Sequence, residues 1–180
     1  TEVKDALDIG YTEKDTQIDG LIAAATSYLD GWTGVLGRAL CEQTWRQDFD
    51  SLSPRCMRLP LFPVISITSV KYKDTTGTEQ TISSSNYTLQ TDDLGSYVQF
   101  LSTYSSPSLW TELPRASVTY KAGYADNGSA STVPEAIKQA IYLITRQWFD
   151  NPTAAVVGQT VERMPFAVDA LLAPYRRIRF

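Results

Sequence analysis

The clearest helical pattern in the chain is that of Val133–Phe149, VPEAIKQAIYLITRQWF. Pro134 suits the first turn of a helix, because the N–H that proline lacks has no partner there. Thr132 is a candidate N-cap, since its hydroxyl can accept the backbone N–H of Glu135. The apolar side chains recur at helical spacing: Ile137, Ile141, Ile144 and Trp148. This spacing predicts an amphipathic helix that buries one apolar stripe.

A second helix is predicted earlier in the chain, with a capping-box-like start at Thr12–Asp15 and an end at about Asp30, because apolar residues again recur every three or four positions. Residues 41–124 instead carry strand patterns. Gln43–Phe49 alternates with a period of two, and glycine-containing turns at Asp74–Gly77 and Asp92–Gly95 predict two hairpins. The prolines of Leu59–Val64 cannot donate to a ladder, so we expect this segment along an edge or over the core.

The order of helix, strands and helices predicts an α+β fold. We expect a helical body, formed by the N-terminal helix and the C-terminal helices, with an inserted small antiparallel β-domain. The expected division is residues 1–40 for the N-terminal part of the body, 41–124 for the β-domain and 125–180 for the C-terminal helices and basic tail. A chain of 180 residues is long enough to bury a sizeable core.

The composition is that of a globular protein, with 43% apolar and 20% charged residues. The net charge of −4 argues against general binding to nucleic acid, which needs a basic excess on some face. No apolar run approaches the ~20 residues that cross a bilayer. We therefore expect a soluble intracellular product without a membrane partner.

Catalytic chemistry has little support in the sequence. The chain contains no histidine, which removes the commonest general base and a common metal ligand. The adjacent acids Asp92 and Asp93 fall in a hairpin turn, where aspartate bonds its own backbone. Cys41 and Cys56 are too few for a zinc site, and whether they pair is left open. The glycines of Gly31–Gly37 lack the lysine of a phosphate-binding loop and predict a helix end with a turn. We expect no enzyme, no cofactor, no metal site and no catalytic residue.

The C-terminal segment concentrates basic residues at Arg176, Arg177 and Arg179. Cations are favourable next to a helix C-terminus, so a solvated tail is one interpretation. Docking onto an acidic partner surface or onto phosphates is the other. The sequence leaves both open.

Several segments, taken in order, resemble the head–tail connector (adaptor) family of tailed bacteriophages and prophages. They are Asp15–Leu40, QTWRQDFD (43–50), RLPLFPVISITSVKYKDTTG (58–77), NYTLQTDD (86–93), VTYKAGYAD (118–126), VPEAIKQAIYLITRQWFDN (133–151) and MPFAVDALLAPYRR (164–177). The most specific are LP-x-x-PV-x-S-x-x-SV-x-Y at Leu59–Tyr72 and P-F-x-V-D-x-L-L-x-P-Y-R-R at Pro165–Arg177. The chain is most similar to the subset with an inserted β-domain.

The resemblance implies a structural virion protein, made in the bacterial host cytoplasm and located in the neck at the head–tail interface. It implies a homo-oligomeric ring, commonly dodecameric, between the portal protein and a stopper or tail-completion protein. Such a ring lines the DNA exit channel, and double-stranded DNA passes without sequence-specific binding. The alternatives are another neck component, such as a stopper or tail-completion protein, and a carboxylate-dependent hydrolase.

Two sets of contact residues are predicted on this basis. The portal-docking set is the tail: Tyr175, Arg176, Arg177, Ile178, Arg179 and Phe180. The inter-subunit set combines small residues of the first long helix with residues of two unassigned loops: Ala23, Ala24, Trp110, Val156, Val157 and Arg163. Ring formation requires heterologous interfaces that close by rotation.

Overall fold

The computed structural model describes residues 2–7, 12–53, 57–125, 131–151 and 166–177. The chain divides into two compact units. Residues Thr1–Leu40 and Thr132–Phe180 form one, here called the helical unit, and residues Cys41–Ser131 form the other, the β-unit. The predicted domain boundaries at residues 40 and 124 stay a prediction.

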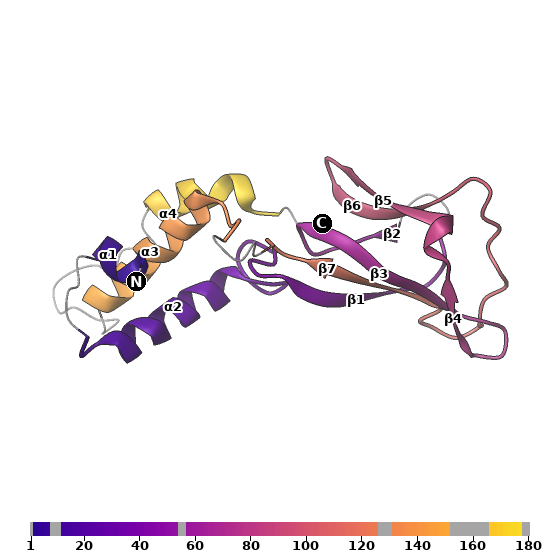
Figure 1. Ribbon diagram of the computed structural model, residues 1–180, viewed down its shortest axis with the longest axis horizontal. Helices are drawn as coiled ribbons and strands as arrows, with labels where there is room; N and C mark the ends of the chain where they lie inside the picture. Colours follow the sequence, from indigo (N-terminus) through magenta and orange to yellow (C-terminus); the bar gives the residue numbers. More distant parts are fainter. Residues whose placement is uncertain (1, 8–11, 54–56, 126–130, 152–165, 178–180) are drawn as a thin grey trace. The chain divides into compact units, whose positions relative to one another are not determined.

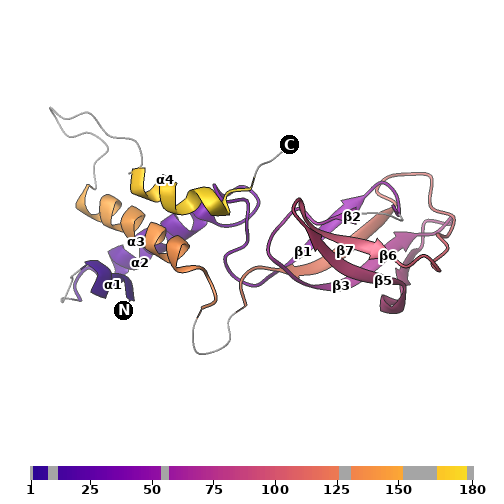
Figure 2. The same ribbon diagram turned by 90° about the horizontal axis from the view of Figure 1, so that it is seen from above.

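The helical unit contains four described α-helices and one 3₁₀ turn. They are α1 (Glu2–Leu7), α2 (Asp15–Leu29), α3 (Glu135–Asp150), α4 (Phe166–Leu172) and η2 (Ala173–Tyr175). Helix α3 lies beside α2, and α1 and α4 both contact α3 (Figures 1 and 2). The two long helices come from opposite ends of the sequence, so their pairing closes this unit.

Helix α3 buries one face, as the apolar spacing predicts, but its stripe differs in detail. Its fully buried residues are Ile137, Ala140, Ile144 and Thr145. Ile141 and Trp148 are only half-buried. The prediction of Thr132 as N-cap is wrong: the helix begins at Glu135 with Pro134 at the cap, because the Pro134 carbonyl accepts the N–H groups of Ile137 and Lys138.

The β-unit consists of two antiparallel sheets (Figure 1). The described strands are β1 (Gln43–Phe49), β2 (Met57–Arg58), β3 (Val64–Lys73), β4 (Glu79–Ile82), β5 (Tyr87–Asp92), β6 (Gly95–Phe100) and β7 (Ala116–Ala122), with a 3₁₀ turn η1 (Ser84–Asn86). The four-stranded sheet has the order β1-β7-β3-β4, and the three-stranded sheet has the order β2-β6-β5. Strand β2 is an edge strand, and the segment after it runs over the core, with Leu59 and Leu61 buried.

The two sheets lie as layers (Figures 1 and 2), and both contribute buried residues to the core of the β-unit. Val70, Val118 and Tyr120 come from the four-stranded sheet, and Val98 from the other, each at most 1% exposed. The Tyr120 hydroxyl accepts the backbone N–H of Leu61 at 3.2 Å. This buried hydroxyl therefore has the partner that burial requires.

The predicted fold class, an α+β helical body with a small inserted antiparallel β-domain, is wrong. The described residues form seven strands in two sheets but only four α-helices, two of which have only six or seven residues. Turn signals correctly placed the hairpins β3–β4 and β5–β6 but do not say which sheet each hairpin joins. The first belongs to the four-stranded sheet and the second to the three-stranded one, so the β-part is a two-layered structure.

Candidate interaction surfaces

The C-terminal residues of the helical unit are bound to the turn that follows α2. The Tyr175 carbonyl accepts a hydrogen bond from Arg38 Nε at 2.6 Å, and the Arg38 guanidinium lies 6.0 Å from the centre of the Tyr175 ring. The backbone N–H of Arg177 donates to the Leu36 carbonyl at 3.1 Å. Residues 175–177, here called the C-terminal anchor, are therefore part of the folded unit rather than a solvated tail.

Glycines shape the turn that receives this anchor. Gly31 and Gly37 have φ angles of 78° and 61°, which favour glycine. A Cβ atom on Gly34 would lie 2.2 Å from the Asp30 carbonyl oxygen, so no larger residue fits there. Asp30 Oδ1 also accepts the backbone N–H of Leu40 at 2.6 Å. The prediction of a helix end with a turn is confirmed.

The basic residues of the portal-docking set differ in their surroundings. Arg176 is exposed and forms an ion pair with Asp169 of α4, with Nη2 and Oδ1 2.6 Å apart. Both partners are about half exposed, so the pair stabilises the fold little. Arg177 is half-buried. Ile178, Arg179 and Phe180 lie outside the described residues. Docking to a portal stays a prediction for the whole set.

The inter-subunit set is divided between exposed, half-buried and undescribed positions. Ala23 and Ala24 are exposed on α2. Trp110 is half-buried: its backbone N–H donates to the Lys73 carbonyl at 2.9 Å, and its ring lies 3.5 Å from where a Cβ on Gly77 would be. The other three residues, Val156, Val157 and Arg163, lie outside the described residues. Trp110 belongs to the β-unit, whereas the two alanines belong to the helical unit.

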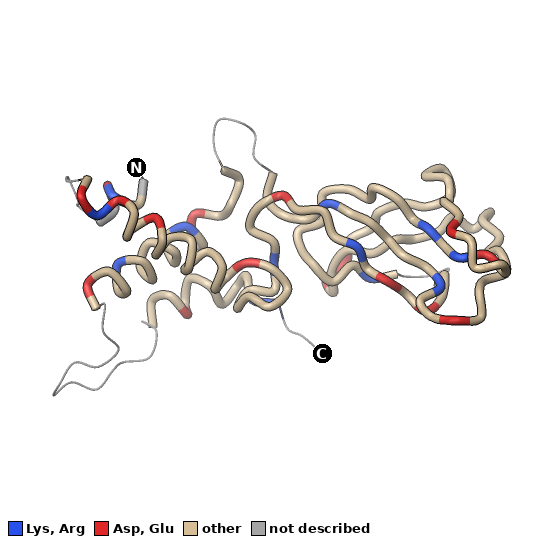
Figure 3. The backbone as a smooth tube through the Cα atoms, turned by 90° about the horizontal axis from the view of Figure 1, so that it is seen from below, with Lys and Arg blue, Asp and Glu red and all other residues tan. Residues whose placement is uncertain are grey.

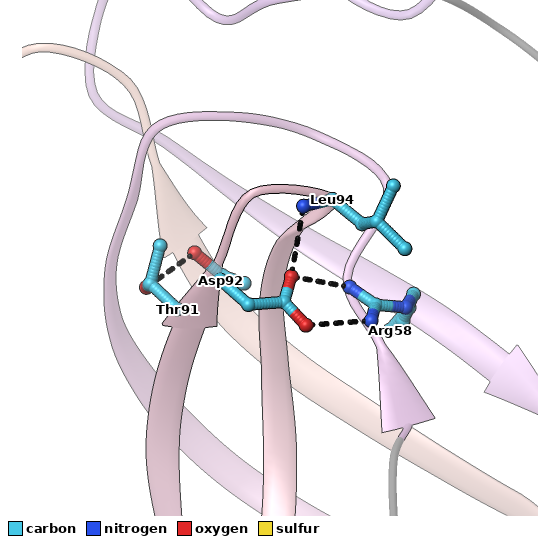
Figure 4. A network of polar contacts seen from close by, with 5 residues as sticks. Arg58, Thr91, Asp92 and Leu94 are labelled. Carbon is cyan, nitrogen blue, oxygen red and sulfur yellow. Dashed lines mark hydrogen bonds and ion pairs between the residues drawn. The ribbon is translucent and has the colours of Figure 1, made fainter.

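Asp92 has a structural role in the hairpin between β5 and β6. Its carboxylate accepts two hydrogen bonds from Arg58, at 2.7 and 2.9 Å, and one from the Leu94 N–H at 2.9 Å (Figure 4). The Arg58 hydrogen bonds lower the pKa of Asp92 from 3.8 to about 2. A carboxylate that stays ionised at neutral pH cannot be a general acid. The predicted turn role fits this geometry.

A basic cluster lies on the outer face of the four-stranded sheet. Arg46 comes from β1, Lys71 and Lys73 from β3, and Arg115 immediately precedes β7. These four residues and Glu79 line a shallow hollow that is open to solvent, here called the sheet hollow. Figure 3 shows lysine and arginine positions in blue on neighbouring strands of this unit.

The register of the sheet explains why these residues meet. Strand β7 pairs with β1 on one side and β3 on the other, so Ser117 lies opposite both Asp48 and Lys71. Sequence reasoning missed the cluster because its members are spread over some 70 positions, from 46 to 115. Alternation on Gln43–Phe49 places Arg46 on the outer face, and this was the signal available.

Other classes of site find no support in the described part of the chain. No group of three or more potential metal ligands occurs among the described residues. None of the described helices has the length and apolar composition that a bilayer span requires. Cys41 is exposed and free, and Cys56 lies outside the described residues.

Comparison with known proteins places these features in a class of phage assembly proteins. The model of the family "Head completion protein" matches residues 1–178, so the chain belongs to the head completion protein family. This membership confirms the predicted relationship to phage head–tail connector proteins. A search of curated proteins gave no match.

Solved structures of gene transfer agent (GTA) particles share the fold. A chain of the empty-particle neck, computed with C6 symmetry, is 22% identical with a TM-score of 0.73, covering 99% of this chain and 89% of that one. A chain of the native GTA virion is 22% identical with a TM-score of 0.72 and the same coverage. A chain of the native neck, computed with C12 symmetry, is 21% identical with a TM-score of 0.66, covering 99% of this chain and 88% of that one.

Proposed function

We propose that this protein is a structural component of the virion neck and acts as a ring-forming adaptor between the portal and the stopper or tail. The family match over residues 1–178 carries the proposal. The likeness to chains from GTA necks computed with six- and twelvefold symmetry supports a ring, because a closed ring needs one chain repeated around an axis.

In the proposed ring, the helical unit supplies the portal contact. The C-terminal anchor holds residues 175–177 on the 31–38 turn, so the chain leaves the unit at a defined point. Arg176 is exposed beside this point, where an acidic surface of the portal could pair with it. Ile178, Arg179 and Phe180 would extend the contact.

The proposed subunit contact uses the exposed alanines of α2. Ala23 and Ala24 lie on a face where Gly20 is also exposed, and no heavy atom lies within 4 Å of a Cβ built on Gly20. Small side chains allow a neighbouring helix to approach closely. Val156, Val157, Arg163 and Trp110 would add contacts from the loops. In this arrangement, DNA passes through the ring without sequence-specific binding.

A matched pair of arginine variants tests the portal contact. Arg176→Gln removes the exposed cation next to the anchor, whereas Arg146→Gln removes an exposed cation of α3 that is paired with Asp150 at 2.6 Å. We expect purified portal rings to retain the Arg146→Gln protein as well as the wild type and to retain about tenfold less of the Arg176→Gln protein. Equal retention of both variants would remove Arg176 from the contact.

A further inference from the structure

The sheet hollow holds more positive charge than its own acids neutralise. Arg46 is paired with Asp48 at 2.8 Å, and Lys71 is paired with Glu79 at 2.9 Å. Lys71 lowers the pKa of Glu79, and Arg46 and Lys73 reinforce this effect, so Glu79 is ionised at neutral pH. The four cations Arg46, Lys71, Lys73 and Arg115 against the two acids leave a net charge of +2 on a chain whose net charge is −4.

Two donors in the hollow remain unused within the described part of the chain. The Nε–H of Arg115 is buried and has no hydrogen-bond partner there, although Nη2 of the same side chain donates to the Thr111 carbonyl at 2.9 Å. Lys73 forms no ion pair with any described residue, and the nearby acids, Glu79 and Asp48, are already bound by Lys71 and Arg46. A buried donor without an acceptor is costly, and an oxyanion would satisfy it.

We propose that the sheet hollow binds a carboxylate side chain, an aspartate or glutamate presented by a partner protein. Arg115 carries an Nε–H that no described residue accepts and a guanidinium that pairs well with carboxylates, and Lys73 supplies the second charge. The hollow is shallow and open to solvent, so a side chain on the surface of a partner reaches it from outside.

Duplex DNA fits this site less well than a single carboxylate. DNA carries a negative charge about every 1.7 Å along its axis. Several phosphates would therefore approach Asp48 and Glu79, which lie among the four cations. One carboxylate leaves the hollow with a net charge of about +1, and no second anionic group has to enter. The inference does not depend on the position of the protein in the neck, because it concerns the β-unit alone.

NMR titration of the ¹⁵N-labelled full-length protein tests the site. The probe is a hexaglutamate peptide at low ionic strength. We expect it to shift the amide signals of Lys73, Arg115 and Ser117, and we expect the shifts to diminish as salt is added. Arg115→Gln and Lys73→Gln should each weaken binding about fivefold. Lys121→Gln is the matched control. Lys121 is a cation of β7, the strand that follows Arg115, and it pairs with Glu42 at 2.7 Å outside the hollow.

Each remaining arm of the experiment has a defined meaning. Arg115→Lys keeps the positive charge but loses the guanidinium. We expect this variant to bind the peptide partially and to melt at an unchanged temperature, which would show that Arg115 acts in binding rather than in folding. Equal weakening by Lys121→Gln would overturn the proposal, since any surface cation would then serve. Tighter Arg115-dependent binding of a 12-base-pair duplex than of the peptide would assign the hollow to phosphates and would also overturn it, as would the absence of any shift with the peptide.

Discussion

At the residue scale, the position of Gly95 determines how the two-layered β-unit closes. Gly95 has a φ angle of 120°, and a Cβ built on it would lie 1.8 Å from Cζ of Phe62. The chain preceding β3 therefore packs directly against the start of β6. Only glycine combines this backbone conformation with this close approach.

A pair of glycine substitutions tests this constraint. We expect Gly95→Ala to destabilise the protein by about 2 kcal/mol or more, because strain at the backbone adds to a clash with Phe62. Gly20→Ala is the control: Gly20 lies in α2 with open space around it, and we expect alanine there to stabilise by about 0.5–1 kcal/mol. Urea unfolding of both variants measures the two effects, and equal effects would contradict the packing described here.

Asp92 gives a prediction with a pH dependence. The pKa of Asp92 in the folded protein is about 2, below the ordinary value of 3.8, chiefly because Arg58 donates to its carboxylate. Folding therefore gains stability from ionised Asp92 above about pH 4, and this gain is lost as the pH falls through about 2. We expect Asp92→Asn to lower the stability of the fold at pH 7. The variant should also lose less stability than the wild type between pH 4 and pH 2.

The neighbouring acid provides the control for this experiment. Asp93 lies next to Asp92 in the same turn, is exposed and forms no hydrogen bond or ion pair with any described residue. Asp93→Asn should leave unchanged both the stability at pH 7 and the stability that is lost between pH 4 and pH 2. If the two variants behave alike in thermal melts across this pH range, the Arg58–Asp92 pair does not hold the hairpin.

At the element scale, helix α3 shows what its apolar spacing can predict. Ile144 is 1% exposed and packs in the helical unit, whereas its neighbour Leu143 is 38% exposed. The spacing of Ile137 and Ile144 correctly identifies the buried face. It does not identify Thr145, which is fully buried although its side chain is polar. Helical periodicity thus locates the face, and packing against α2 and α4 decides its width.

Adjacent alanine substitutions on α3 test this assignment. We expect Ile144→Ala to lower the free energy of unfolding by about 2–5 kcal/mol, since it leaves a cavity in the core. Leu143→Ala should cost less, because Leu143 is 38% exposed and its truncation leaves an open surface rather than an enclosed cavity. Chemical denaturation monitored by circular dichroism gives both values. A larger loss for Leu143→Ala would mean that α3 presents a different face.

The strands show both the reach and the limit of sequence reasoning. The alternation of Gln43–Phe49 predicted β1 with its exact bounds, and the two glycine turns predicted two hairpins. The fold class was nevertheless wrong, because alternation describes one strand and says nothing of its partners in space. The sheet hollow was missed for the same reason: Arg46, Lys71 and Arg115 become neighbours only through the pairing of β7 with both β1 and β3.

At the scale of the whole molecule, the structure changes the interpretation of the C-terminal segment most. The arginines at 176 and 177 allowed a solvated tail or a docking segment. The structure binds residues 175–177 to the 31–38 turn and leaves Arg176 exposed beside it. This arrangement rules out a free tail for residues 175–177, and docking to the portal stays a proposal. The residues that would complete the contact, Ile178, Arg179 and Phe180, follow directly in the sequence.

Cryo-electron microscopy of purified particles tests whether the chain forms a ring in the virion neck, as we propose. We predict density for this fold in a closed ring between portal and tail, with Arg176 facing the portal. In particles assembled without the protein, this ring and the tail should both be missing. Particles whose neck lacks this chain, or in which it occupies another position, would contradict the account.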